Sequence, residues 1–134
     1  MVARLLVVDD EEKVRVYLAR LLAHKGYQVE TAADGESAFE KITQQDFDVV
    51  LLDIIMPGAS GMEMLPRIKK IKPKVQVIML TGNASVTIGV ESIKLGAFDY
   101  LLKPIDLERL HECLSDALDH VRYLKSGPSV LKIP

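Results

Sequence analysis

The stretch Asp48–Pro57, which reads DVVLLDIIMP, constrains the fold of this chain more than any other. Its residues 49 to 52 are apolar at every position, which is typical of a central parallel strand covered on both faces. The run ends at Asp53, and the Met56-Pro57-Gly58 that follows favours a turn. Ligands of open α/β sheets bind beyond the carboxyl ends of the strands. Asp53 is therefore a candidate functional residue.

Strand and helix patterns alternate along the rest of the chain. Short apolar runs predict strands at 5–8, 27–32, 48–53, 75–80 and 98–102. Helical spacing predicts helices from 11 to 26, from a cap at Asp34, from 62 to 71, from 84 to 95 and from 106 to about 125. Five such pairs imply an α/β fold, a parallel sheet with helices on both faces. Periodicity leaves the strand order open, but a central first strand would bring Asp9, Asp10 and Asp53 together.

The length and charge of the chain limit its class. A chain of 134 residues fits one domain, which we expect at 1–125, with the Ser-Gly-Pro-Ser run opening a tail or linker at 126–134. A net charge of -2 gives no reason to expect nucleic acid or an anionic membrane as a partner. We find no signal peptide and no apolar run near the ~18 residues that span a bilayer. With Cys113 as its only cysteine, the chain is expected in the cytoplasm.

Polar residues mark the carboxyl ends of four predicted strands: Asp9 and Asp10, Asp53, Thr81, and Lys103. Crowded carboxylates repel one another and would have raised pKa values unless a cation neutralised them, and Mg2+ prefers such oxygen ligands. A lysine and a hydroxyl beside them would donate hydrogen bonds to a phosphoryl group. Asp53 would then be the nucleophile.

Each of these residues also has a plain structural explanation. The two acids after the first strand could cap a helix, Asp53 and Thr81 could be turn residues, and Lys103 could be a solvated lysine. For the structural explanation to hold, all of these separate explanations would have to apply at once, at four different strand ends. Four other candidates have no partner at metal-ligand spacing and are interpreted as structural: His24, His111, Cys113 and His120.

Longer motifs extend the pattern: Val7-Val8-Asp9-Asp10, Leu51-Leu52-Asp53-Ile54-Ile55-Met56-Pro57, Gly61-Met62-Glu63, Thr81-Gly82, and Gly96-Ala97-Phe98-Asp99-Tyr100-Leu101-Leu102-Lys103-Pro104. Together they closely resemble the receiver domain of bacterial two-component response regulators, over residues 3 to about 124. The resemblance implies a flavodoxin-like (βα)5 three-layer sandwich with a five-stranded parallel sheet of order 2-1-3-4-5.

The resemblance also assigns roles around the acceptor. It implies that Asp53 accepts a phosphoryl group from a sensor histidine kinase. It implies that Asp10 binds Mg2+ directly, that Asp9 does so mainly through water, and that the backbone carbonyl of Ile55 completes the site with Asp53.

Further roles follow from the same resemblance. Thr81 and Lys103 would contact the phosphoryl group, and Tyr100 would be the switch aromatic. The bond between Lys103 and Pro104 is cis in the family, as a proline allows.

Residues 58–63 and 105–110 look like receivers of nitrogen-regulatory-type enhancer-binding activators. The function implied is a phosphorylation switch that controls an output such as transcription, through an output domain or a homodimer. Such a domain catalyses only its own phosphorylation and dephosphorylation and turns over no free substrate.

Three other functions fit these residues less well. A flavin carrier would need a hydroxyl- and glycine-rich phosphate loop after the first strand, where this chain has Asp9-Asp10-Glu11-Glu12. An aspartyl-phosphate phosphatase would need a second acid two residues after Asp53, where Ile55 stands. A receiver-like interaction module that signals without phosphorylation is the remaining alternative, against which the complete acidic site argues.

The predicted helix at 84–95 carries two apolar stripes. We expect Val86, Val90 and Ile93 to face the sheet, which leaves Ala84, Ile88 and Leu95 nearly opposite. Packing against a neighbouring helix would explain the second stripe. A partner surface that includes Ile88 and Leu95 is the functional interpretation.

Overall fold

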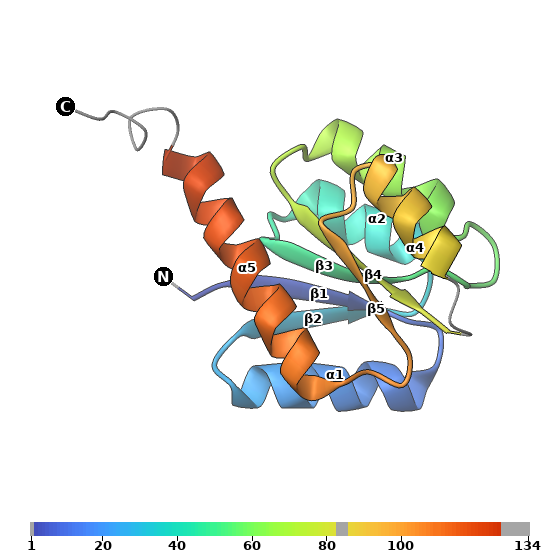
Figure 1. Ribbon diagram of the computed structural model, residues 1–134, viewed down its shortest axis with the longest axis horizontal. Coiled ribbons are helices and arrows are strands. Elements are labelled where there is room, and N and C mark those ends of the chain that lie inside the picture. Colours follow the sequence, from blue (N-terminus) through green and yellow to red (C-terminus); the bar gives the residue numbers. More distant parts are fainter. Residues whose placement is uncertain (1, 83–85, 127–134) are drawn as a thin grey trace.

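The computed structural model describes residues 2–82 and 86–126, and within them strands and helices alternate five times (Figure 1). The strands are β1 (Arg4–Val8), β2 (Gln28–Ala32), β3 (Val49–Asp53), β4 (Gln76–Thr81) and β5 (Asp99–Leu102). The helices are α1 (Glu12–His24), α2 (Gly35–Gln44), α3 (Gly61–Ile71), α4 (Val86–Lys94) and α5 (Leu107–Ser126). Ala84, the expected first residue of α4, lies outside the described residues.

The strands form one parallel sheet of order β2-β1-β3-β4-β5, as the flavodoxin-like expectation required. β1 lies between β2 and β3, and Val8 pairs with Leu52 across the β1–β3 ladder. Asp9 and Asp53 each follow those residues directly. The central position of β1 therefore brings their two carboxylates to the same end of neighbouring strands.

Helices cover both faces of the sheet. Figure 1 shows α1 and α5 on one side and α2, α3 and α4 on the other. Alternate residues of β1 divide between the two cores: Leu5 and Val7 pack under α1 and α5, and Leu6 and Val8 under α2 and α3. The run 49–52 in β3 has no exposed surface, which confirms the central strand expected there.

Side chains define where helices begin. The carboxylate of Asp34 accepts a hydrogen bond from the amide of Ser37 at 2.8 Å, which confirms the predicted cap of α2. The hydroxyl of Ser60 accepts one from the amide of Glu63 and caps α3. None of the helices within residues 2–82 and 86–126 combines the length and apolar character needed to cross a membrane.

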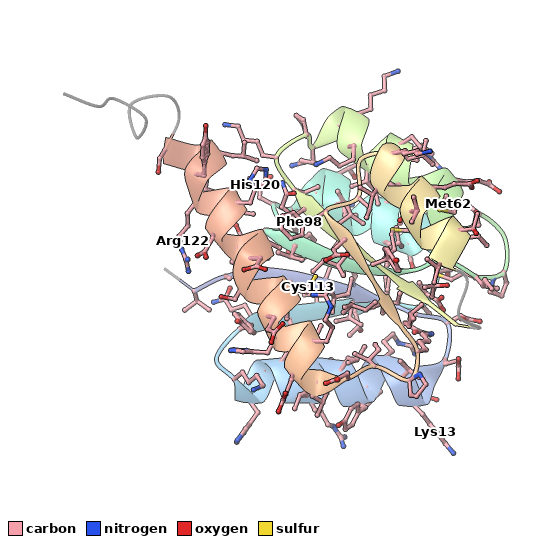
Figure 2. The ribbon with its side chains drawn as sticks, in the orientation of Figure 1. Lys13, Met62, Phe98, Cys113, His120 and Arg122 are labelled. Atoms are coloured by element: carbon pink, nitrogen blue, oxygen red, sulfur yellow. The ribbon has the colours of Figure 1, made fainter. Side chains whose placement is uncertain are left out.

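The inner face of α5 is apolar. Figure 2 shows Cys113 between α5 and the sheet, and its side chain is buried. The ring of His120 lies 5.9 Å from that of Phe98 and 6.2 Å from that of Tyr123, measured between centroids. The burial of Cys113 and the ring contacts of His120 agree with a structural role for these two residues.

The orientation predicted for α4 is wrong. Val86, Val90 and Ile93 were expected to face the sheet, but their side chains are 50%, 43% and 43% exposed. The small residues Gly89 and Ser92 are buried instead. The physical reason is the ring of Tyr100 on β5, which occupies the space beneath the helix: a Cβ on Gly89 would lie 2.5 Å from its Cδ2. Only a glycine lets the helix lie this close to the ring.

The expected partner surface at Ile88 and Leu95 stays a prediction, and the two side chains differ in exposure. Ile88 is partly buried and packs against the same core cluster as Tyr100, because it precedes Gly89 on α4. Leu95, just after the helix, is 46% exposed. The exposed apolar stripe of this helix consists of Val86, Val90 and Ile93, which we call the α4 stripe.

Candidate functional site

Carboxylates meet at the carboxyl ends of β1 and β3. Asp9 follows β1, Asp53 ends β3, and both are buried, whereas Asp10 is exposed. Each of the three offers a carboxylate oxygen, and these oxygens lie within 4.8 Å of one another. The three acids that the sequence singled out therefore form one cluster.

Lys103 closes the cluster from the end of β5. Its Nζ donates to Oδ2 of Asp9 at 2.8 Å and to Oδ2 of Asp53 at 3.3 Å. Its backbone amide donates to the carbonyl of Thr81 at 2.7 Å, which continues the β4–β5 ladder and fixes where the side chain starts. Burial alone would lower the pKa of Lys103, but the bond to Asp9 and the charges of both acids outweigh it and raise the pKa. Lys103 is therefore a firmly held cation.

The pKa of Asp53 is subject to opposing effects from its surroundings. Burial, and then the charge of Asp9, raise its pKa to about 6, although Lys103 acts in the opposite direction. Its Oδ1 accepts a hydrogen bond from the amide of Ile55 at 3.2 Å, and the side chain of Ile55 is 65% exposed. The lysine alone does not neutralise the cluster, so a further cation would be favoured there.

Asp9 and Asp10 differ in how many of their oxygens are in use. Oδ1 of Asp9 accepts from the amide of Glu11 at 2.9 Å, and Oδ2 is held by Lys103. Asp10 makes no side-chain hydrogen bond or ion pair with any other residue that the structure describes. Its carboxylate is the one that remains open to a ligand.

Three carboxylates around one point suit a hard divalent cation. Such ions take oxygen ligands, and Mg2+ in particular keeps several waters beside one or two carboxylates. The open carboxylate of Asp10 and the raised pKa of Asp53 both fit that donor set.

Thr81 lies on β4 and Tyr100 on β5, and the side chain of neither makes a hydrogen bond with the clustered acids in the described part of the chain. Thr81 is buried at the end of β4, beside β3, and its hydroxyl donates to the carbonyl of Gly82 at 3.1 Å. The ring of Tyr100 packs against Gly89 and the core under α4. The bond between Lys103 and Pro104 is cis, as the resemblance implied.

Gly61, the first residue of α3, lies directly against the backbone of the acceptor. A Cβ at this position would stand 2.3 Å from the carbonyl oxygen of Asp53 and 2.9 Å from Cα of Ile54. The amide of Gly61 donates to the carbonyl of Ile54 at 2.9 Å. The start of α3 therefore supports the loop that follows β3, at a distance that only glycine permits.

Two residues at this end of the sheet were missed in the sequence. Nη1 of Arg15 on α1 donates to the backbone carbonyl of Asp9 at 2.8 Å. Oε1 of Glu11 lies 3.9 Å from Nζ of Lys103. A single arginine on a helix, such as Arg15, forms no sequence pattern that indicates a functional role. Glu11 directly follows Asp10, but the sequence indicates it only as part of an acidic turn.

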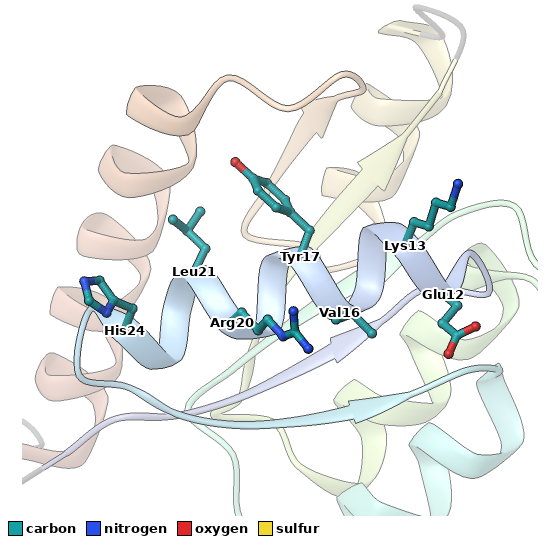
Figure 3. Close-up of a pocket in the computed structure, with 7 residues that line it drawn as sticks. All are labelled: Glu12, Lys13, Val16, Tyr17, Arg20, Leu21 and His24. Carbon is teal, nitrogen blue, oxygen red and sulfur yellow. The ribbon is translucent and has the colours of Figure 1, made fainter.

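A depression on the surface lies away from this cluster. Figure 3 shows it over the exposed face of α1, with a volume of about 730 Å³. Its lining residues are Glu12, Lys13, Val16, Tyr17, Arg20, Leu21 and His24. None of the clustered residues contributes to it, so the depression is separate from the acidic site.

Comparison with known proteins gives a consistent result. The family model described as the response regulator receiver domain matches residues 5–115. The transcriptional regulatory protein ZraR of Klebsiella oxytoca is 43% identical over 122 residues, which cover 91% of this chain and 28% of ZraR. The DNA-binding transcriptional regulator NtrC of Azospirillum brasilense is 32% identical over 117 residues, covering 87% of this chain and 24% of NtrC.

Solved structures agree. A response regulator receiver domain protein from Clostridium thermocellum superposes with a TM-score of 0.87 at 35% identity, covering 92% of this chain and 99% of that protein. The chain thus spans about a quarter of the length of ZraR and NtrC but nearly all of a separate receiver domain.

Proposed function

Because this chain belongs to the family of response regulator receiver domains, we propose that it is a switch in which Asp53 accepts a phosphoryl group from a sensor histidine kinase. The domain is a signalling domain related to the nitrogen-regulatory-type regulators ZraR and NtrC, which control transcription. The observation that carries the proposal is the ammonium of Lys103, held between Asp9 and Asp53.

In the proposed reaction, an oxygen of Asp53 attacks the phosphorus of the donor. The bond from phosphorus to the donor's histidine nitrogen breaks, and its electron pair stays on that nitrogen. Lys103 and the hydroxyl of Thr81 stabilise the charge on the phosphoryl oxygens, since such transfers depend mainly on positioning and electrostatics. The domain would catalyse its own phosphorylation and, with water as nucleophile, its own dephosphorylation.

Mg2+ is the cofactor of this proposal. Asp10 and Asp53 would hold it directly, Asp9 through water, and the backbone carbonyl of Ile55 would complete the set. When bound, the ion would neutralise the acidic cluster and the incoming phosphoryl group. The open carboxylate of Asp10 supports its place as the direct ligand.

Output is proposed to pass through Tyr100 and α4. Phosphate on Asp53 would draw Thr81 inward, and Tyr100 would follow into the space released. Because the ring packs against Gly89, any such movement would shift α4. The α4 stripe, together with Leu95, then becomes the proposed contact for an output domain or a second copy of the chain, and the partly buried Ile88 contributes less to it.

The relatives support an output domain, because this chain covers only about a quarter of their length. We propose that residues 1–125 are the receiver and that 126–134 are a tail or the start of a linker. A cytoplasmic location belongs to the same proposal.

The acceptor can be tested by intact mass after incubation with acetyl phosphate, with and without Mg2+. We expect the gain of one phosphoryl group, only with Mg2+, and none in Asp53→Asn, because an amide is a far poorer nucleophile. A modified Asp53→Asn protein would place the acceptor elsewhere. An unmodified wild type that still binds its partners would favour an interaction module that signals without phosphorylation.

The output surface needs a separate test. Val90→Ser with Ile93→Ser should leave phosphorylation intact and weaken phosphate-dependent self-association, measured by sedimentation. Val16→Ser on α1, which is 36% exposed and far from α4, is the matched control. Equal association of wild type and the double mutant after phosphorylation would remove the α4 stripe from the proposal.

A further inference from the structure

Arg15 makes a contact that neither the acceptor nor the output surface explains. It lies in the first turns of α1, is partly buried, and donates from Nη1 to the backbone carbonyl of Asp9 at 2.8 Å. That carbonyl belongs to the peptide unit between Asp9 and Asp10. Arg15 therefore holds the backbone that joins two of the three clustered acids.

This loop has other restraints, but among the described residues none of them acts on the carbonyl of Asp9. The amide of Glu11 donates to Oδ1 of Asp9 at 2.9 Å, and Lys103 holds Oδ2. The amide of Asp9 donates to Ala32 at 3.2 Å, which continues the β1–β2 ladder by one residue. Beyond that point the side chain of Asp10 has no partner among the described residues. The N-cap residue of α1, Glu11, makes no side-chain capping bond. Only the backbone sets the direction in which the carboxylate of Asp10 leaves the chain.

We infer that Arg15 is a positioning residue for the divalent-cation site, which acts by fixing the Asp9–Asp10 peptide and so the direction of the Asp10 carboxylate. This inference rests on the proposed Mg2+ site. A peptide plane that rotates carries the next side chain with it, so loss of the contact leaves Asp10 with several orientations. Binding of the cation must then fix the Asp10 side chain in one orientation. The free-energy cost of this ordering lowers the affinity for the cation.

The direction of the effect separates positioning from charge. Arg15 carries a positive charge near the site, and removing that charge would by itself strengthen the binding of a cation. Loss of positioning weakens it. A fall in Mg2+ affinity after neutral substitution therefore cannot arise from simple electrostatics.

The experiment measures Mg2+ binding by calorimetry for wild type, Arg15→Gln and Arg20→Gln. Arg20 lies on the same helix and lines the depression of Figure 3, and it has no hydrogen bond or ion pair with another described residue. Its substitution thus removes the same charge from α1 without removing a contact. We expect Arg15→Gln to lose about tenfold in affinity, as is typical when a partner outside the ligand shell is removed. Arg20→Gln should bind as wild type does.

Two further measurements separate positioning from a general loss of stability. Melting temperatures in EDTA should differ little between the two variants, whereas the rise on adding Mg2+ should be smaller for Arg15→Gln. Arg15→Lys, which can still donate one hydrogen bond, should recover part of the affinity. If Arg15→Gln does not fold, Arg15→Met keeps the aliphatic stem and replaces it in every comparison.

The outcomes distinguish this inference from the function on which it rests. A wild type that binds no Mg2+ overturns both. A wild type that binds Mg2+, with equal affinities in Arg15→Gln and Arg20→Gln, overturns the role of Arg15 and leaves the metal site standing. Tighter Mg2+ binding by Arg15→Gln would mean that Arg15 acts on the site only through its positive charge, and it would overturn the positioning role.

Discussion

The ring of Tyr100 lies so close to Gly89 that a single Cβ on the glycine would overlap it, at 2.5 to 2.7 Å from three ring carbons. A strand residue and the helix above it are thereby joined without a hydrogen bond. Any rotation of the ring changes the surface on which α4 rests, and any shift of α4 changes the space available to the ring.

We expect Gly89→Ala to lower the free energy of unfolding by up to about 2 kcal/mol. Overpacking costs about 1–3 kcal/mol, and the better helix propensity of alanine offsets up to about 1 kcal/mol of that. Denaturant melts of Gly89→Ala, Tyr100→Ala and the double mutant test the contact. In the Tyr100→Ala background the alanine at 89 should no longer destabilise, because the ring is gone. Additive losses would mean that the two residues do not interact.

Asp9 and Asp10 should respond differently to removal. Asp10→Ala should change the stability of the metal-free protein by less than about 0.5 kcal/mol, because it breaks no contact with a described residue. It should nevertheless weaken Mg2+ binding more than Asp9→Ala does. Asp9→Ala should lower stability, because it leaves the amide of Glu11 without its acceptor and leaves Lys103 with only the longer bond to Asp53. Calorimetric Mg2+ titration and melts in EDTA provide the two measurements, and equal Mg2+ affinities would refute the ranking.

Lys103→Ala should abolish or strongly slow labelling by acetyl phosphate while the domain stays folded. In EDTA we expect a loss of about 3 kcal/mol, the lower end for a buried pair that loses one partner. Mg2+ should restore part of that loss, because it supplies the missing positive charge to Asp9 and Asp53. A variant without a cooperative thermal transition, even in Mg2+, would make Lys103 a structural residue.

Cys113 should be inert in the folded protein. Burial, and then the charge of Asp99, raise the pKa of its thiol from 9.0 to about 12. Iodoacetamide at pH 8 should therefore modify the denatured chain much faster than the native one. Equal rates would show that the thiol is accessible.

The same pKa shift predicts the direction of a pH effect. Above pH 9 the unfolded chain releases the thiol proton and the folded chain keeps it, so the unfolded state binds fewer protons and stability falls as pH rises. The stability advantage of wild type over Cys113→Ala should be complete below pH 9 and shrink as pH approaches about 12. Denaturant melts at several pH values would measure it.

The sequence was sufficient for the sheet and for the acidic cluster, for a physical reason. β3 is apolar at each of its positions 49 to 52, which is expected only for a strand covered by helices on both faces of the sheet. Acids placed after β1 and β3 then had to meet once β1 was central. The contacts of Lys103 could not be read from spacing, because they depend on how its strand pairs with β4.

The orientation of α4 could not be predicted from its own residues. The spacing of Val86, Val90 and Ile93 is that of an apolar stripe, and from periodicity alone this stripe is predicted to face the core. What decided the orientation was the size of Tyr100, which requires small residues above it, and Gly89 and Ser92 supply them. Arg15 was missed for a similar reason, since its contact is with a backbone carbonyl that carries no sequence signal.

The close approach of Gly61 to the backbone of Asp53 has a consequence for how this protein tolerates change. Gly61 has no side chain and takes no part in the chemistry, so a survey that ranks residues by reactive groups would pass over it. Any larger residue must displace the carbonyl of Asp53 or lift the start of α3. In a library of random single substitutions screened for loss of signalling, Gly61 should therefore be recovered about as often as the acceptor itself, and its variants should fail while every acid and the lysine are intact.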